Sequence, residues 1–502
     1  MTGARRWRSG IASGALALLA AACSDAPGTG GAAVARYQST RLCALVPARH
    51  LADAVFPPTP PVEVFGTDLG WTYEIAGGRV PILFGDSWQR IDVCPIQLND
   101  DSLGELHLPA SDWPGFTATQ SISDEQCLDI TWVVDDAGTS FAPIVLHRWD
   151  GVPVPLGPLN TPVVGFWDGE REWAIFIVGG GQACAAAESA SEAPCPAELS
   201  PQAADLSCGT VMGQPRCVDP TSTRRGNGGE ALYLHVAERV GPAQYVSRAV
   251  FLTNKYLNLT ARTVRAFHPD DPRRDDYAVG TAALLIWGRP GFDDLAGDGE
   301  LAPYFAWHPL PFERDGERIV WAPRYLAGFD GDVPTYAQDQ RAAVPLYGGE
   351  FEPVNHVAVS WVGPLSRWLM IYGGSTTDYA DPERRSGRGQ SVPGAIYARH
   401  APRPWGPWSE PEPIFTNEDA AQDLVCGHQA PVGCLPQPEP PIRPQCIEAV
   451  DPRSGGSLYG ANVIDPLTRA APGDERAADV FWNYSTWHPY SVVLVRTRIA
   501  LD

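Results

Sequence analysis

Short apolar runs recur along this chain at regular intervals, and none of them shows a sustained helical period. Several runs end in glycine in a similar way, as in ILFGD, AIFIVGG, LLIWG and LMIYGG. The 50 glycines and 49 prolines are scattered between such runs, where they interrupt helices far more than strands. We therefore predict an all-β protein.

The strand-like runs fall into five groups. The groups are 62–75 with 80–86; 161–167, 173–178, 231–237 and 245–252; 282–287, 304–307 and 319–322; 354–362, 368–372 and 395–399; and 457–464, 480–484 and 492–498. This repetition predicts a five-bladed β-propeller, in which each blade buries its faces against two neighbours; a β-sandwich is the alternative. A strand near 36–46 would complete the last blade and close the ring.

The first 22 residues have the features of a lipoprotein signal peptide. A basic start precedes an apolar stretch, 11–22, that is too short to span a bilayer, and small residues lead into Cys23. We expect lipidation of Cys23, a flexible tether over 23–36 and one exported domain over 37–502, anchored to a bacterial membrane. An ordinary secretory signal, in which Cys23 has no role, is the alternative.

The cysteine count also favours export. Of the 11 cysteines, ten remain after Cys23, an even number that suits disulfide pairing in an oxidising compartment. Most of them lie in two stretches without apolar periodicity, near 182–227 and 417–447, which we interpret as loop insertions tied by disulfide bonds. The pairing cannot be deduced from the sequence. Zinc is disfavoured because CxxC-type pairs are absent from the sequence.

The charge of the chain argues against a nucleic-acid partner. A formal net charge of −22 would repel a phosphate backbone. The signatures G-x-S-x-G and H-E-x-x-H, the P-loop and the dinucleotide-binding glycines are absent from the sequence as well. We therefore predict no cofactor and no metal, and the oligomeric state stays open.

Two aspartates lie on successive predicted strands of the first group. If 76–78 forms a three-residue loop, Ile75 pairs with Arg79, and Asp68 lies directly opposite Asp86. Side chains that are directly opposed share a face and lie about 5 Å apart, so each carboxylate would shift the titration of the other. A turn-capping role beside glycine is the alternative for both residues.

Paired carboxylates suit glycoside hydrolysis, which needs one acid to protonate the leaving oxygen and one carboxylate to activate water or attack the sugar. Glu352 and Asp465 are candidates for a further acid from another blade. Aromatic and polar side chains near the predicted strand ends would bind the sugar. These candidates are Trp71, Trp88, Asn355, His356, Trp487, His488 and Tyr490.

Several motifs occur in a fixed order along the chain. They are GTDLG, ILFGDSW, NDDSLG, RWLMIYGG, PWGPWSEP, LYGANVIDP and STWHPYSVVLVR. Together they resemble the domain of unknown function 4185 family, and this resemblance implies a five-bladed propeller with, in some members, endo-acting hydrolysis of D-arabinan. GTDLGWTY also comes close to one sialidase box, but further copies of that box are absent from the sequence.

Two functions therefore remain. One is an envelope-anchored glycoside hydrolase that acts on arabinofuranose-rich or related polysaccharide. The other is a non-catalytic propeller that binds glycan or another envelope component.

Overall fold

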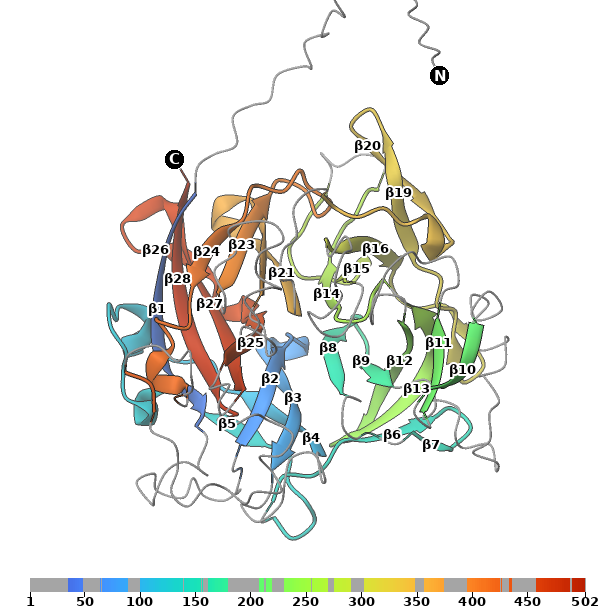
Figure 1. The fold of residues 1–502 in the computed structure, drawn as a ribbon, viewed down its shortest axis with the longest axis horizontal. Coiled ribbons are helices and arrows are strands. Elements are labelled where there is room, and N and C mark those ends of the chain that lie inside the picture. The colour runs from blue at the N-terminus through green and yellow to red at the C-terminus, as the bar shows by residue number, and fades with distance from the viewer. Residues whose placement is uncertain are drawn as a thin grey trace, which may run out of the picture. The chain divides into compact units, whose positions relative to one another are not determined.

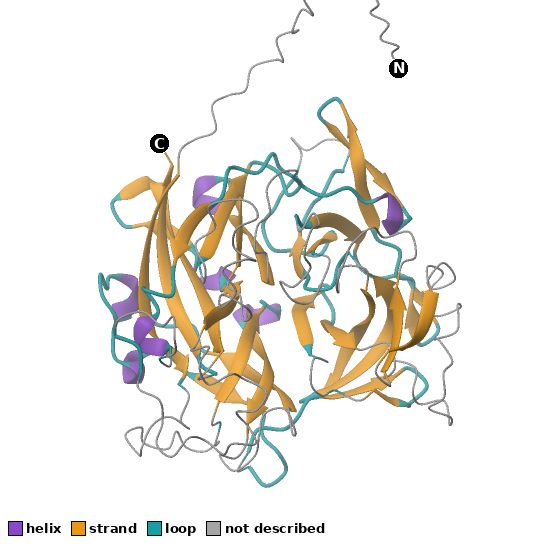
Figure 2. Ribbon diagram, viewed as in Figure 1, coloured by secondary structure: helices purple, strands orange, loops and turns teal. Residues whose placement is uncertain are grey.

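Five β-sheets stand as blades around a common axis in the computed structural model (Figure 1). The structure describes residues 35–47, 64, 66–88, 100–138, 140–154, 156, 161–178, 207–211, 214–218, 230–253, 255–269, 275–289, 302–347, 356–373, 395–424, 426, 433–435, 457–487 and 490–501. Within these residues, the fold is built from strands and short 3-10 helices (Figure 2). The predicted all-β five-bladed propeller is confirmed.

The core strands of each blade are ordered from the axis outward. Blade 1 contains β2 (Gly66–Thr72), β3 (Val80–Trp88), β4 (Asp100–Leu106) and β5 (Ile130–Trp132). Blade 2 contains β8 (Pro162–Trp167), β9 (Glu172–Val178), β12 (Glu230–Gly241) and β13 (Gln244–Thr253), with β6 (Val145–Arg148) and β7 (Pro153–Val154) at its outer edge. Blade 3 contains β14 (Thr260–Val264), β15 (Ala283–Gly288), β16 (Tyr304–Pro309), β19 (Arg324–Asp330) and β20 (Val333–Ala337), besides the small hairpin β17 (Arg314–Asp315) and β18 (Arg318–Ile319).

The last two blades follow the same order. Blade 4 contains β21 (His356–Val362), β22 (Arg367–Gly373), β23 (Ile396–Ala401) and β24 (Glu412–Phe415). Blade 5 contains β25 (Ser457–Val463), β27 (Asp474–Trp487), β28 (Val492–Leu501) and β1 (Ala35–Val46), with β26 (Arg469–Ala471) beside β27. The described 3-10 helices are η2 (Ala76–Gly78), η3 (Pro114–Phe116), η4 (Asp124–Gln126), η9 (Gln340–Ala342), η10 (Gly363–Leu365), η12 (Ala421–Asp423) and η13 (Asp465–Leu467).

The second strands of the blades are buried along almost their whole length. Every residue of β15 is buried, and β9 and β22 are buried after their first residue. Both faces of such a strand pack against neighbouring blades, so its sequence is continuously apolar rather than alternating. This burial explains why these runs were recognised from the sequence.

Several other strands were missed because their sequences are polar. The inner strand of blade 3 is β14, with the sequence TARTV, and β4 has the sequence DDSLGEL. The prediction of a strand at 319–322 was wrong beyond Ile319, which ends β18. Part of the stretch at 182–227 is also not loop, because β10 (Ser207–Val211) and β11 (Gln214–Val218) form a hairpin that extends blade 2.

The ring is closed by the N-terminal strand, as predicted. Strand β1 pairs antiparallel with β28 from Ala35↔Leu501 to Val46↔Val492. A disulfide between Cys43 and Cys127 then joins β1 to the η4 region of blade 1. A second disulfide, Cys426–Cys434, lies within the predicted second insertion. Both bonds fit the expectation of an oxidising, extracytoplasmic compartment.

A buried ion pair ties the closing strand to blade 4 as well. Arg41 Nε and Nη2 donate to the two carboxylate oxygens of Asp423, at 2.9 and 2.6 Å. Tyr484 donates to the same carboxylate at 2.9 Å. Blades 4 and 5 are therefore joined through one satisfied charge network. In the part of the chain that the structure describes, no helix is long and apolar enough to cross a bilayer.

The inner strands β2, β8, β14, β21 and β25 contact one another in a closed cycle around the axis (Figure 1). Strands β2 and β25 run in the same direction, because Tyr459 reaches Asp68 near their starts and Thr72 Oγ1 donates to Val463 O near their ends. We call the end of the ring where these strands begin the Asp68 end. The end where they finish is the Asp465 end.

Candidate active site

The hairpin of β2 and β3 carries the first predicted acid pair. Its loop is the predicted one, since Ala76–Gly78 forms η2 and Ile75 N donates to Arg79 O at 3.0 Å. The register, however, slips by one residue between Trp71 and Leu69, so Asp68 faces Gly85. The prediction that Asp68 lies directly opposite Asp86 was wrong, because Gly70 forms a β-bulge.

The bulge at Gly70 is held by blade 5. Gly70 has a φ of +76°, and its carbonyl accepts hydrogen bonds from Asn462 Nδ2 at 3.1 Å and Asn483 Nδ2 at 2.8 Å. The neighbouring Leu69 N donates to Ser485 Oγ at 2.6 Å. These buried partners satisfy the backbone groups that the bulge removes from the strand ladder. Blade 5 thereby sets how β2 presents Asp68.

Asp68 is buried, with 6% of its surface exposed. Its Oδ2 accepts a hydrogen bond from the Tyr459 hydroxyl at 2.5 Å, and among the described residues its Oδ1 has no hydrogen-bond partner. Burial and then the charge of Asp86 raise the pKa of Asp68 well above its usual range, while the bond from Tyr459 opposes this rise. This environment favours the protonated form of Asp68.

Asp86 remains electrostatically coupled to Asp68 despite the slipped register. It lies in a second bulge, between Phe84 and Ser87, and has a φ of +20°, which is uncommon outside glycine. Asp86 is only half-buried. Burial, followed by the charges of Asp86 and Asp68, also raises the pKa of Tyr490 well above its usual range. Tyr490 is therefore one predicted residue that the fold brings to the acid pair.

A third aspartate, Asp101, lies near Asp68 and was not among the site residues predicted from the sequence. Asp101 is buried on β4, and its Oδ1 accepts a hydrogen bond from Thr161 Oγ1 of blade 2 at 2.9 Å. A Cβ at Gly85 would lie 2.6 Å from Asp68 Oδ1 and 2.9 Å from Thr161 Oγ1, so only glycine fits between them. Asp101 belongs to the NDDSLG motif, which was the available signal.

His356 and Trp71 lie beside the Tyr459 ring. The ring centroids of Trp71 and His356 are 5.7 Å apart, and those of His356 and Tyr459 are 6.1 Å apart. Burial and then the positive charge of Arg289 lower the pKa of His356 to about 3, so its imidazole is neutral at physiological pH. Arg289, which is fully buried, and Tyr459 were not among the predicted site residues.

Asp465 does not join the acid pair. It begins η13 at the opposite end of the ring, where Arg262 Nε lies 2.8 Å from its Oδ2 and Ser360 donates to its Oδ1. The prediction that Asp465 approaches Asp68 from another blade was wrong, because the inner strand β25 carries the chain across the ring before Asp465. Its contacts make it a connection between blades 3, 4 and 5.

Several predicted residues cannot be placed with the others. Glu352, Asn355, His488 and Cys23 lie outside the described residues. For Trp88 and Trp487 only the backbone is described. Trp88 pairs with Gly66 and Trp487 pairs with Ser457, so both positions lie at the Asp68 end.

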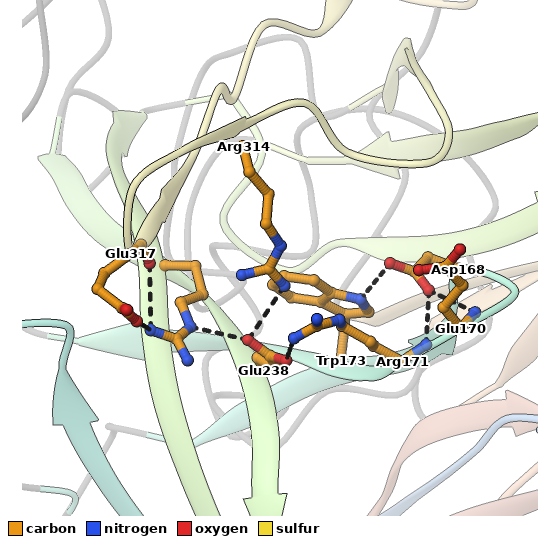
Figure 3. Close-up of polar contacts among 8 residues, drawn as sticks. Asp168, Glu170, Arg171, Trp173, Glu238, Arg314 and Glu317 are labelled. Carbon is orange, nitrogen blue, oxygen red and sulfur yellow. Dashed lines mark hydrogen bonds and ion pairs between the residues drawn. The ribbon is translucent and has the colours of Figure 1, made fainter.

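A second charged cluster offers a contrast (Figure 3). Glu238 accepts hydrogen bonds from Arg171, from Arg248 Nε at 2.8 Å and from Arg314 at 3.2 Å. Burial alone would raise its pKa, but the three guanidinium groups outweigh burial and lower it. Arg314 also lies over the Trp173 ring. This network joins blade 2 to the β17–β18 hairpin. Because the charge of Glu238 is paired with three guanidinium groups, we interpret the network as structural rather than reactive.

Comparisons with known proteins give structural matches only. No protein-family model and no curated protein matches the chain. A protein of Bacteroides ovatus ATCC 8483 described as a candidate hydrolase is 11% identical, with a TM-score of 0.40; the match covers 88% of this chain and 87% of that one. A thermostable family-43 glycoside hydrolase is 10% identical, with a TM-score of 0.32 and coverage of 89% and 96%.

An exo-β-1,3-galactanase from Phanerochaete chrysosporium is 8% identical, with a TM-score of 0.32; the match covers 86% of this chain and 64% of that one. Matches of this kind assign neither a substrate nor a reaction to this chain. Membership in the domain of unknown function 4185 family also stays a prediction.

Proposed function

We propose that this protein is a glycoside hydrolase whose acid pair is Asp68 and Asp86. One observation carries the proposal. At the end of the ring where the inner strands begin, a buried carboxyl, one oxygen of which has no hydrogen-bond partner among the described residues, is coupled to a second carboxylate that is half-exposed. Such a pair divides into a group that keeps its proton and a group that keeps its charge.

In this mechanism Asp68 protonates the departing glycosidic oxygen, and Asp86 activates water or attacks the sugar. Burial and the charge of Asp86 favour the protonated form of Asp68, so we assign it the role of the acid. Asp86 is the more exposed of the two and supplies the negative charge. We propose arabinofuranose-rich or related polysaccharide as the substrate, as the family resemblance implies.

The test is incubation with arabinans, galactans and other cell-wall polysaccharides, followed by sizing of the products. Release of oligosaccharides by the wild type and its loss in Asp68→Asn and Asp86→Asn support the proposal. A nitrophenyl glycoside of the released sugar separates the two roles. Asp68→Asn should retain more activity on it than Asp86→Asn, because nitrophenolate leaves without protonation. Full activity of either folded variant on polysaccharide removes that residue from the site.

The alternative is a catalytically silent propeller that binds glycan. Among the described residues, Asp86 is the one acidic neighbour that shifts the pKa of Asp68, and no acid from another blade does so. That observation favours binding. Retention of the protein by a polysaccharide without release of any product would support this alternative.

We further propose that the protein is anchored through Cys23. The two disulfides support an extracytoplasmic location for the protein. Cys23→Ala should move the protein from the membrane fraction to the soluble fraction. Unchanged partitioning would refute the anchor without bearing on hydrolysis.

A further inference from the structure

Three buried polar atoms, in side chains connected through Tyr459, have no hydrogen-bond partner among the described residues. They are Asp68 Oδ1, Trp71 Nε1 and His356 Nδ1. Each of the three side chains is more than nine-tenths buried, at 6%, 2% and 8% exposure. A buried donor or acceptor that stays unsatisfied destabilises the fold, so three such atoms in one connected set of side chains indicate a site prepared for a ligand.

The three side chains come from blades 1 and 4 and are connected through Tyr459 of blade 5. Trp71 lies against His356, His356 lies against Tyr459, and Tyr459 donates to Asp68. Trp71 and Asp68 share the same face of the hairpin, because the bulge pairs them with Leu83 and Gly85, which are two residues apart. The bulge therefore places Trp71 on the face of the hairpin that carries the proposed acid.

The chemistry of these atoms restricts the ligand. An indole nitrogen only donates, whereas a neutral imidazole nitrogen donates or accepts according to its tautomer. His356 is kept neutral by burial and by Arg289, so it cannot pair with an anion as a cation would. Asp86 would repel an anionic group, and the buried guanidinium of Arg289 would disfavour a cation. Uncharged hydroxyl groups, which both donate and accept, fit all three atoms.

We propose that Trp71 Nε1 and His356 Nδ1 bind adjacent hydroxyl groups of an uncharged sugar residue next to Asp68. This inference rests on the proposed function, since it assigns the substrate class of the same site. The pair would select neutral glycans over uronic-acid glycans. It would also hold the sugar ring so that its glycosidic oxygen lies near Asp68.

The test is native affinity electrophoresis in gels that contain arabinan, galactan or polygalacturonate. The wild type should be retarded by a neutral polysaccharide and not by polygalacturonate. Trp71→Phe keeps the ring and removes the donor, and His356→Asn removes the imidazole. Each variant should weaken retention about tenfold, as loss of one or two hydrogen bonds would do. The melting temperature of Trp71→Phe should not fall, because the lost N–H has no hydrogen-bond partner among the described residues.

The chain offers matched controls away from the Asp68 end. Trp368 Nε1 and His235 Nε2 are also buried without a partner among the described residues, and burial, with Arg148, likewise lowers the pKa of His235 to about 3. Trp368→Phe and His235→Asn should bind like the wild type. Equal losses in the controls, equal binding of polygalacturonate, or retention by none of the three polysaccharides overturns the inference.

Failure of this inference is distinguishable from failure of the proposed function. Retention that depends on Trp71 and His356 without any product release leaves the inference standing and removes the hydrolase. Product release with an unchanged KM in both variants leaves the hydrolase standing and removes the inference.

Discussion

The hydroxyl of Tyr459, in the last blade, donates a 2.5 Å hydrogen bond to Oδ2 of Asp68, in the first. The two residues are 391 positions apart in the chain and meet where the ring closes. Burial and then the charge of Asp68 raise the pKa of Tyr459 well above its usual range, so the phenol stays a donor. Tyr459 thus positions the proposed acid and limits the rise of its pKa.

Tyr459→Phe should move the pH profile of hydrolysis. The hydrogen bond stabilises the ionised form of Asp68, so its removal raises the pKa of Asp68 further. The alkaline limb of the pH profile of kcat/KM should shift to higher pH by about one unit. Tyr484→Phe, which removes a similar bond to Asp423, is the control and should leave the limb in place. A shift toward acid pH would contradict the role of Asp68 as the acid.

Asp68→Asn should be more stable than the wild type at neutral pH. The folded pKa of Asp68 is raised, so its contribution to stability is largest below the unfolded pKa of about 3.9 and declines as pH rises toward the folded pKa. Asparagine does not titrate, so its contribution to the free energy of unfolding does not decline as pH rises. The free energy of unfolding of the variant should exceed that of the wild type at pH 7, and the difference should vanish near pH 4, as measured by urea titration. A loss of stability at pH 7 would show that Asp68 is a structural residue.

Gly70→Ala tests the bulge. At a φ of +76°, a Cβ would lie 2.9 Å from Asn483 Nδ2. Strain and crowding together should cost about 2–3 kcal/mol of unfolding free energy and should also reduce activity, because Asp68 would be displaced. Gly77→Ala is the matched control, since Gly77 has a φ of +81° but no atom within 4 Å of its Cβ. It should cost only about 1 kcal/mol, and equal costs in the two variants would mean that the bulge is not tightly held.

The two disulfides should differ in their effect on stability. Cys43–Cys127 closes a sequence separation of 84 residues, and Cys426–Cys434 closes one of 8. In the chain-entropy account, these loops correspond to about 4.6 and about 2.5 kcal/mol. The double variant Cys43→Ser/Cys127→Ser should therefore lower the melting temperature more than Cys426→Ser/Cys434→Ser. The opposite order would mean that β1 holds the ring closed without its covalent bond.

Much of the fold followed from local patterns. The buried second strands of the blades are continuous apolar runs, and the loop at Ala76–Gly78 and the closing strand were both predicted. Strand β14 was not, because an inner strand that carries Thr and Arg lacks the apolar run that identifies its neighbours. The pairing of Cys43 with Cys127 likewise depends on which blades become adjacent.

The candidate site was predicted only in part for a related reason. Asp68 was selected as an acid on a predicted strand, and His356 as a polar side chain near a predicted strand end. Tyr459 and Asp101 were not selected, although both lie in motifs of the chain. Asp465 was selected by its position in a repeat and lies at the other end of the ring. Position within a repeat predicts the blade of a residue, but not the end of the ring that it reaches.

The sequence by itself determined the number of blades and the strand that closes them, because side-chain periodicity and apolar runs are local properties. Only the tertiary structure decided on which face of the β2–β3 hairpin the side chains of Asp68 and Asp86 lie. The bulge at Gly70 depends on hydrogen bonds from Asn462 and Asn483, which are 392 and 413 residues away. A local pattern does not contain such partners, and one inserted residue in a strand is enough to change the register of the pair.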